Sequence, residues 1–587
     1  MPMTQSSLVG VLRERASLQP DDLAYTYMNY EVDPEGVAIS LTWAQLYRKV
    51  HSLAWELRQM AEIGDRAVIV APQGLEYVIA FLATLQAGLI GVPLSVPQAG
   101  KGGRHDERIA AVIEDSAPTI LLTTSPVTAS LTAYAVASGD RPAPVIVEVD
   151  KLDLDERRKN LKSREEFPET AYLQYTSGST RTPAGVMVTN ANVSANFEQF
   201  VHDQFGAFGH IAPAGTTVAI WLPFYHDMGL LFGIGYPILG GWHTVFTTPM
   251  AFTAKPARWV QMMASYPNVL TAGPNFAFEL AAGRTTDEDM AGLDLGGVAA
   301  LVSGAERVHE ATLRRFAKRF AKFNFNPEVF KPSYGLAEAT LYIATRAAGS
   351  PPNVVAFDAD KLAAGHAERC ALEDGTALVS YGTETTPLVR IVDPETGVEC
   401  PAGIIGEIWT YGENNCLGYW RKPEQTERVF KATIVDPSEG TPAGPWLRTG
   451  DLGVISEGEL FIIGRIKDLL IVRGRNHYPD DIESTITEIT GGRVAAFSVE
   501  EDRTEQLVAF IEIKNRNGEF TGERLESLKR DVATAVSETH GISAADLVLV
   551  SSGSIPLTTS GKVRRSSCAE QYRNRDFTRI DDKVQSA

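Results

Sequence analysis

Short apolar runs alternate with helical patterns through the first three hundred residues, and this alternation constrains the fold more than any other feature. Helical patterns such as Leu75–Gln86 and Ala254–Met263 lie between the runs. Strands that alternate with helices are typical of largely parallel sheets covered by helices on both faces, so we expect an α/β fold. Six runs have the length and composition of buried strands: Ala67–Ala71, Thr119–Leu122, Val145–Val149, Thr217–Leu222, Thr244–Thr247 and Val298–Val302.

The pattern changes after about residue 380. Three strand-like runs, Leu388–Val392, Gly406–Tyr411 and Glu459–Ile463, follow one another closely with glycine and proline turns between them. This spacing predicts a small antiparallel sheet or barrel over residues 380–463. A shorter α+β pattern then continues to the end of the 587-residue chain. Because single cores rarely grow beyond ~300 residues, we expect two domains, 1–466 and 467–587.

Charge and composition exclude several classes of function. The formal net charge of −19 disfavours nucleic acid and anionic membrane surfaces as main partners. The longest apolar stretch, Tyr77–Val96, contains Gln86 and several glycines and prolines, so it predicts a helix running into a strand and no stable membrane insertion. Arg13 and Arg15 interrupt the N-terminal apolar run, which does not resemble a signal peptide. Four cysteines without metal-site spacing indicate free thiols and a cytoplasmic protein: Cys370, Cys400, Cys416 and Cys568.

A strand-to-loop motif offers a candidate phosphate site. The apolar run that begins at Tyr172 leads into small residues that leave room for backbone N–H groups and hydroxyls to reach a phosphate chain. The Gly-Lys-Ser/Thr ending of a P-loop is absent. A Ser/Thr-rich turn without a ligand is the alternative. The loop residues are Thr176, Ser177, Gly178, Ser179, Thr180 and Arg181.

Two further motifs hold candidate catalytic side chains. His226 follows a strand and could meet a substrate carboxylate, although an isolated histidine is more often structural. In the motif Lys331–Glu338, Tyr334 could stack on a purine and Glu338 could bind Mg²⁺ together with phosphate oxygens. The alternative is a turn followed by a helix whose first-turn glutamate suits the helix dipole.

The C-terminal third supplies two more candidates. Asp451 lies in a predicted tight turn, where its carboxylate could accept both hydroxyls of a ribose or form an Asx-turn. Lys562 lies in a Gly-Ser loop, from which a mobile domain could carry it to a distant active site to stabilise charge on a carboxylate and an α-phosphate. A solvated surface lysine is the alternative. With Arg564 and Arg565 it forms a basic cluster too short for a nucleic-acid-binding stripe.

In this order, the motifs resemble those of the adenylate-forming superfamily, which includes acyl-CoA synthetases, firefly-type luciferases and peptide-synthetase adenylation domains. The strings LQYTSGSTRTPAGVMV, WLPFYHDMGL, PNFAFELAA and GRIKDLLIVRGRNHYPDDIE are most similar to fatty acyl-AMP ligases of the mycobacterial type. Residues 351–371 resemble the insertion that separates this branch from acyl-CoA ligases. One departure concerns the phosphate loop, where Ala184 replaces the usual lysine and Arg181 could supply the charge instead.

The resemblance implies a fold, a reaction and a set of site residues. The fold would have two helix-covered, mostly parallel sheets, a small β-barrel subdomain and a mobile α+β C-terminal domain that pivots near Lys467. ATP and Mg²⁺ would activate a long-chain fatty acid as an acyl-adenylate, and the acyl group would pass to the phosphopantetheine thiol of an acyl carrier protein or polyketide synthase carrier domain.

The implied site residues fall into groups by role. Catalytic residues would be Lys562, His226 and Glu338, and Glu338 would also be the metal ligand. Residues Thr176–Arg181 would bind the β/γ-phosphates, and Asp451 with Arg465 the ribose. The adenine pocket would be formed by Ser303, Gly304, Ala305, Glu306, Ser333, Tyr334, Gly335 and Ala337.

An acyl tail needs an apolar tunnel, for which Phe276, Phe278, Leu280 and Gly229–Ile234 are candidates unless they are ordinary core. Two alternative functions remain. A fatty acyl-CoA synthetase would share the first step and differ in the acceptor. A non-catalytic acyl-binding protein would keep the fold without the chemistry, but the catalytic candidates are all present in the sequence.

Overall fold

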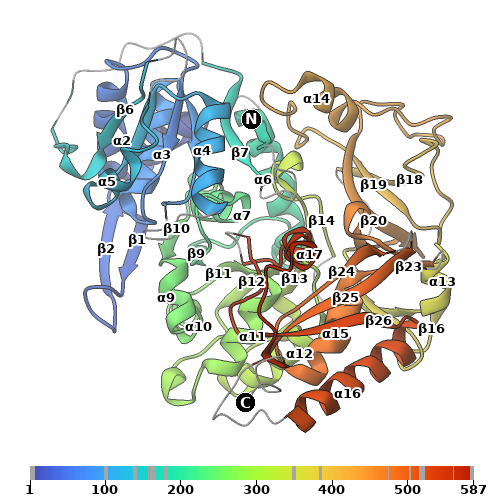
Figure 1. Ribbon diagram of the computed structural model, residues 1–587. Coiled ribbons are helices and arrows are strands. Elements are labelled where there is room, and N and C mark those ends of the chain that lie inside the picture. Colours follow the sequence, from blue (N-terminus) through green and yellow to red (C-terminus); the bar gives the residue numbers. More distant parts are fainter. Residues whose placement is uncertain are drawn as a thin grey trace.

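The computed structural model describes residues 7–97, 104–136, 142–156, 158, 167–176, 183–346, 352–382, 387–472, 475–501, 504–513, 522–558 and 561–581. It is an α/β protein whose larger part contains two mixed sheets (Figure 1). The first sheet has the order β14-β13-β12-β11-β9-β10-β1-β2, and only its two edge strands, β14 and β2, run antiparallel to their neighbours. Its strands are β1 Leu23–Asn29, β2 Val37–Thr42, β9 Thr217–Ile220, β10 His243–Phe246, β11 Val269–Gly273, β12 Val298–Ser303, β13 Phe330–Tyr334 and β14 Ala344–Thr345.

The second sheet has the order β6-β5-β3-β4-β7-β8, and only β8 is antiparallel. Its strands are β3 Arg66–Ile69, β4 Ile90–Pro93, β5 Ile120–Thr123, β6 Val145–Glu148, β7 Thr170–Tyr175 and β8 Gly185–Thr189. The central strands β3 and β5 are mostly apolar, with only Arg66 and Thr123 at their ends polar, as expected for parallel strands covered on both faces. The predicted pair of helix-covered, mostly parallel sheets is therefore confirmed.

The helices of this part follow from local sequence. Helix α2 (Trp43–Leu57) begins at a capping box formed by Thr42 and Gln45. Helix α3 (Leu75–Ala87) is apolar on nearly all sides, because it is buried within the main hydrophobic core. The other helices here are α1 Leu8–Leu18, α4 Arg104–Ser116, α5 Ser125–Leu131, α6 Asn190–Gln204, α7 Asp227–Leu230, α8 Tyr236–Gly240, α11 Asn275–Arg284 and α12 Glu310–Phe320.

One predicted helix differs from the structure. The expected helix Ala254–Met263 is divided into α9 (Pro249–Ala254) and α10 (Ala257–Ala264). Pro256 lies at the break, where it has no N–H to donate and keeps Lys255 out of the helical region, at φ −140° and ψ 89°. The prediction treated two amphipathic segments as one.

The β-rich region contains two small sheets. An antiparallel sheet has the order β18-β19-β20-β21, from Leu388–Val392, Gly406–Tyr411, Leu447–Ser456 and Glu459–Arg465, with α14 (Pro423–Phe430) inserted before β20. The segment that contains the predicted insertion forms a three-stranded sheet of order β16-β15-β17, from Arg369–Cys370, Val354–Phe357 and Thr376–Val379, with α13 (Ala359–Ala363). A bridge between Ser380 and Phe461 connects the two sheets.

The last part of the chain forms its own sheet, in the order β24-β25-β26, from Val494–Glu501, Thr504–Ile513 and Ala544–Ser551. It is preceded by the hairpin β22–β23 (Leu470–Val472 and Arg475–His477) and packs with α15 (Pro479–Thr490), α16 (Gly522–His540) and α17 (Arg565–Asn574). In Figure 1 these orange and red elements lie beside the green elements that include α11, α12, β12 and β13. Among the described helices, none combines the length and apolar character needed to cross a bilayer.

Candidate active site

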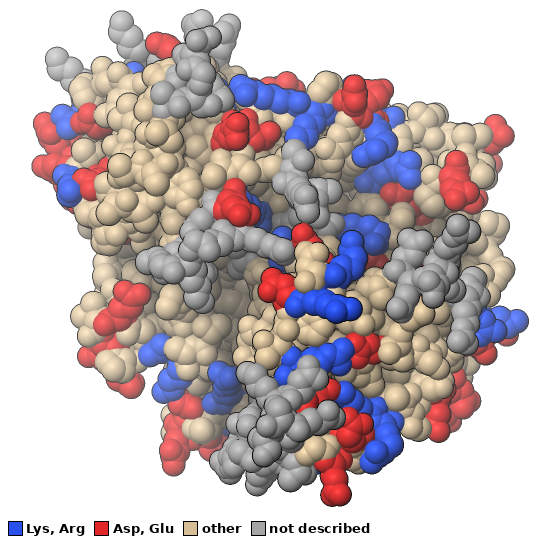
Figure 2. All heavy atoms as spheres, in the orientation of Figure 1, with Lys and Arg blue, Asp and Glu red and all other residues tan. Residues whose placement is uncertain are grey.

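A cavity of about 1930 Å³ opens where the carboxyl ends of several strands of both large sheets face the C-terminal part of the chain. Strands β4, β7, β12 and β13 contribute residues near their carboxyl ends to its wall, as is usual for ligand sites in α/β folds. Figure 2 shows acidic and basic side chains close together around the middle of this face. The cavity therefore gathers residues that are far apart in the sequence into one polar site.

Most of the candidate site residues line this cavity. They are Thr176, His226, Gly304, Ala305, Glu306, Ser333, Tyr334, Gly335, Ala337, Glu338, Asp451, Arg465 and Lys562. Ser303 is fully buried at the end of β12 and does not line the cavity. Residues Ser177, Gly178, Ser179, Thr180 and Arg181 lie outside the described residues.

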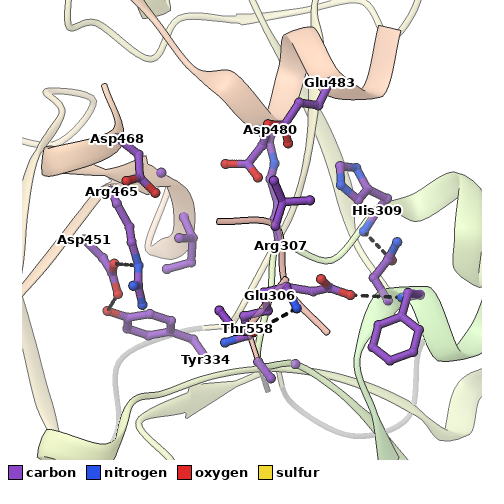
Figure 3. A pocket seen from close by; sticks show the side chains of 18 of the residues that line it. Glu306, Arg307, His309, Tyr334, Asp451, Arg465, Asp468, Asp480, Glu483 and Thr558 are labelled. Carbon is purple, nitrogen blue, oxygen red and sulfur yellow. Dashed lines mark hydrogen bonds and ion pairs between the residues drawn. The ribbon is translucent and has the colours of Figure 1, made fainter. Parts of the chain in front are cut away.

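Asp451 is the centre of a charged cluster at one end of the cavity (Figure 3). Its Oδ2 accepts a hydrogen bond from the Tyr334 hydroxyl at 2.8 Å, and its Oδ1 lies 3.1 Å from Nε of Arg465. Asp451 and Arg465 face each other across β20 and β21, and the carboxylate raises the pKa of Arg465. The remaining lone pairs of this fixed carboxylate can accept the two hydroxyls of a ribose.

The wall next to this cluster is formed by two backbone segments in close contact. A side chain on Gly304 would place its Cβ 2.7 Å from the carbonyl oxygen of Ser333, so only glycine fits there. The next residue, Ala305, has φ +67°, a left-handed conformation that is uncommon for a residue with a side chain. Such strained backbone often lies at ligand sites, and here it borders the predicted adenine pocket.

Glu338 provides a partly buried carboxylate that lines the cavity. It accepts a hydrogen bond from the Tyr419 hydroxyl at 2.8 Å, and burial raises its pKa. Mg²⁺ is usually held by one or two carboxylates together with waters and substrate phosphate oxygens, so this donor fits a metal shared with a nucleotide. A bound cation would favour the ionised form of Glu338.

His226 and Asp227 form a second pair at the carboxyl end of β9. Nδ1 of His226 lies 2.6 Å from Oδ1 of Asp227, which also accepts a hydrogen bond from the Met228 amide at 2.7 Å. Burial alone would raise the pKa of Asp227, but His226 and the charge of Lys562 lower it. Gly229 allows this corner, because a Cβ there would lie 2.0 Å from the Pro223 carbonyl oxygen.

Lys562 reaches the cavity from the C-terminal part of the chain. Its amide donates to the Thr558 hydroxyl at 3.0 Å, and the preceding Gly561 (φ +88°) lies against the ring of Phe276 on α11. Burial and the charge of Arg465 lower the pKa of Lys562, while nearby carboxylates oppose this shift. These carboxylates come from three other segments: Asp227, Glu306 and Asp451.

The candidates for the acyl tunnel separate into two groups. Phe276, Leu280 and Phe232 line the cavity. Phe278 does not line it and packs instead against Trp259, Phe316 and Phe330 in the core. The interpretation of Phe278 as a tunnel residue is therefore wrong, because its side chain points to the opposite face of α11.

Arg307, Tyr419 and Arg108 are among the cavity residues that the sequence did not reveal. Arg307 follows the Ser303–Glu306 segment directly and forms an ion pair with Asp481 at 2.6 Å. Tyr419 binds Glu338, and Arg108 on α4 borders the phosphate loop. Of these three, only Arg307 could have been found from the sequence. It directly follows a predicted site segment, and two acidic residues that could pair with it, Asp480 and Asp481, lie in the first turn of α15.

This fold, with a cavity that Lys562 enters from the C-terminal part of the chain, is that of an adenylate-forming enzyme. The family description "AMP-binding enzyme" matches residues 12–420, and "Disco-interacting protein 2-like, AMP domain" matches residues 467–582. The chain belongs to the AMP-binding enzyme family and is an adenylate-forming ligase.

Known proteins refine this assignment. The chain is 57% identical over 585 residues to a protein of Mycobacterium tuberculosis assigned as the fatty-acid--CoA ligase fadD25, covering 99% of this chain and 100% of that protein. It is 54% identical over 588 residues to the long-chain-fatty-acid--AMP ligase FadD26 of Mycobacterium marinum, covering 100% of both.

Two solved structures are also similar. The fatty acyl-adenylate ligase of L. pneumophila, in complex with acyl adenylate and pyrophosphate, has a TM-score of 0.71 and 31% identity, covering 97% of this chain and 96% of that one. A structure from a study of fatty acyl-adenylate ligases from E. coli and L. pneumophila has a TM-score of 0.84 and 26% identity, covering 98% and 99%. The predicted resemblance to fatty acyl-AMP ligases is confirmed.

Proposed function

We propose that this ligase activates a long-chain fatty acid with ATP, releases pyrophosphate, and transfers the acyl group from the acyl-adenylate to the phosphopantetheine thiol of a carrier protein. The observation that carries the first step is the position of Lys562 in the same cavity as Asp451, Arg465 and Glu338. Apolar lining by Phe232, Phe276 and Leu280, together with the names of the similar proteins, supports a fatty-acid substrate.

In the proposed first step, a carboxylate oxygen of the fatty acid forms a bond to the α-phosphorus of ATP, and the bond from that phosphorus to the bridging oxygen of pyrophosphate breaks. Asp451 and Arg465 hold the ribose, and the buried ammonium of Lys562 stabilises the charge that develops between the carboxylate and the phosphate. His226, fixed by Asp227, faces the substrate carboxylate. Mg²⁺, held by Glu338, would offset the charge of the phosphate oxygens.

We further propose that residues 1–466 and 467–587 are domains that move relative to each other about Lys467. Two hydrophobic clusters consist only of residues beyond 469, which supports an independent C-terminal core. The inserted segment would restrain this motion. In support, Tyr478 packs in one cluster with Phe357 and Leu362, and Asp360 lies 3.0 Å from Arg475.

Product analysis tests the proposal. The purified protein is incubated with ATP, Mg²⁺ and a mixture of fatty acids, alone, with coenzyme A, or with a carrier protein bearing phosphopantetheine. We expect acyl-adenylate and pyrophosphate in every mixture, and acyl-carrier protein only in the last. Abundant acyl-coenzyme A would favour the acyl-CoA synthetase alternative, which the name of the fadD25 relative suggests. The absence of pyrophosphate in all mixtures would favour a non-catalytic binding protein.

A further inference from the structure

Arg108 lies where the predicted phosphate loop begins. It belongs to α4, and its Nη2 donates to the carbonyl oxygens of Thr176 at 3.1 Å and Tyr175 at 3.4 Å. Tyr175 is the last residue of strand β7 and Thr176 follows it, and Arg108 lines the cavity together with both residues. Among the residues that the structure describes, only these two carbonyls accept from its guanidinium, which has five N–H donors in all, so further donors can reach a ligand.

Arg564 brings a second guanidinium to the same cavity from the C-terminal part of the chain. It follows Lys562 by two residues and lines the cavity, and its amide is held by the Pro556 carbonyl oxygen at 2.9 Å. Burial lowers the pKa of Arg108, and the positive charge of Arg564 lowers it further. Both arginines line the same cavity, and the charge of Arg564 acts on Arg108 without an opposing carboxylate from the described residues among the causes of its pKa shift.

The neighbouring arginine shows how an arginine is neutralised here. Arg565 has three carboxylate partners, Asp468 at 3.3 Å, Asp480 at 2.6 Å and Glu483 at 2.7 Å. Within the described ranges, neither Arg108 nor Arg564 has a carboxylate ion-pair partner. A partly buried pair of like charges is unfavourable unless an anion lies with it, and guanidinium groups bind phosphate oxygens in a fork geometry.

We propose that Arg108 and Arg564 form a binding site for the β- and γ-phosphates of ATP and for the pyrophosphate product, a site completed only when the C-terminal part is docked. This phosphate site rests on the proposed function and adds two residues to it. The polyphosphate bridges the two guanidinium groups and draws Lys562 into place. When pyrophosphate leaves, the repulsion between the arginines returns and favours release of the C-terminal part. The two arginines also supply charge that Ala184 cannot.

The test compares ligands with and without the terminal phosphates. The variants Arg108→Gln, Arg564→Gln and the double variant are assayed for the KM of ATP, for pyrophosphate affinity by calorimetry, and for binding of an acyl-sulfamoyl-adenosine, which mimics the acyl-adenylate but lacks pyrophosphate. We expect each single change to raise the KM of ATP and the Kd of pyrophosphate about 10- to 100-fold, the range for a lost charge-assisted hydrogen bond. The Kd of the sulfamoyl compound should change less than about threefold.

Arg314→Gln, an exposed arginine on α12, is the matched control and should leave all three values unchanged. Arg108→Lys should recover part of the lost pyrophosphate affinity, which a purely structural role would not explain. An unchanged KM of ATP in both single variants overturns the proposal, as does an equal loss for ATP and the sulfamoyl compound. If the wild-type protein binds pyrophosphate but forms no acyl-adenylate, the proposed function fails while the arginine site remains.

Discussion

At the scale of single residues, the site is organised by the field around Lys562. Burial lowers the pKa of Lys562 and the charge of Arg465 lowers it further, while the carboxylates of Asp227, Glu306 and Asp451 favour the charged form. Glu306 is itself fixed, because its Oε1 accepts a hydrogen bond from the Phe276 amide at 2.9 Å. A charge held in a low-dielectric site acts more strongly on a developing negative charge than one in water.

Lys562→Ala should therefore reduce fatty-acid-dependent pyrophosphate release by about 100- to 1000-fold, the usual effect of removing one preorganised donor. The melting temperature should stay within a few degrees, because the loop is also held by Thr558 and Phe276. Transfer from a preformed acyl-adenylate should continue. Lys318→Ala, on the exposed side of α12, serves as control. Pyrophosphate release at the wild-type rate in the Lys562 variant would exclude its catalytic role.

Most residues proposed from the sequence lie in a short motif next to a strand end or turn, although Asp451 lies within strand β20 and not in the predicted tight turn. His226 and Glu338 could be proposed from their own neighbours in sequence. Tyr419 and Arg108 could not be proposed in this way, because they reach the cavity from elements with no local motif. They become candidates only because they contact Glu338 and Thr176 in space. Three-dimensional proximity of this kind leaves no trace in one sequence.

At the scale of elements, a line of polar groups connects three strands of the first sheet. The Thr26 hydroxyl on β1 lies 2.9 Å from the Ser40 hydroxyl on β2 and 2.9 Å from Nε2 of His243 on β10. Burial lowers the pKa of His243 to about 4. Apolar periodicity predicted the strands themselves, but not this connection, because the partners are about two hundred residues apart in sequence.

Because burial lowers the pKa of His243, we expect the folded protein to lose stability in acid. The unfolded chain takes up the proton near pH 6.5 but the folded chain only near pH 4, so stability is present above 6.5 and is lost as the pH falls toward 4. Between pH 7 and pH 5 we expect a loss of up to about 2 kcal/mol from this residue. Urea unfolding of His243→Gln should show a correspondingly smaller loss between these pH values.

The control for this experiment is His366→Gln, because His366 is exposed on the inserted segment. His540, whose pKa burial also lowers to about 4, contributes equally to the wild type and both variants and cancels in the comparison. Identical pH dependence in the wild type and His243→Gln would contradict the assignment.

At the scale of the whole molecule, one ion pair connects the two parts of the chain beside the cavity. Arg307, after β12, lies 2.6 Å from Asp481 in the first turn of α15, and both side chains are largely buried. Burial would raise the pKa of the adjacent Asp480, but Arg565 and Arg307 lower it. Arg565 is close in sequence to Lys562, so this network connects the first sheet to the loop that carries the ammonium.

Breaking this pair should favour undocking of the C-terminal part. Ion pairs on the surface contribute little and fully buried pairs contribute several kcal/mol. For a pair of intermediate burial such as this one, we expect its loss to destabilise the docked state by about 2 kcal/mol, which lowers the docked population roughly 30-fold. Arg307→Asp should thus slow pyrophosphate release by about that factor and spare acyl transfer from a preformed adenylate. The swap Arg307→Asp with Asp481→Arg should restore much of the rate. Arg475→Asp, which breaks the exposed pair with Asp360, should change it less than about threefold. A docking contact should affect only the adenylation step, which needs Lys562 in the cavity. Equal losses in pyrophosphate release and in acyl transfer, without rescue by the swap, would therefore mean that Arg307 supports only the local fold.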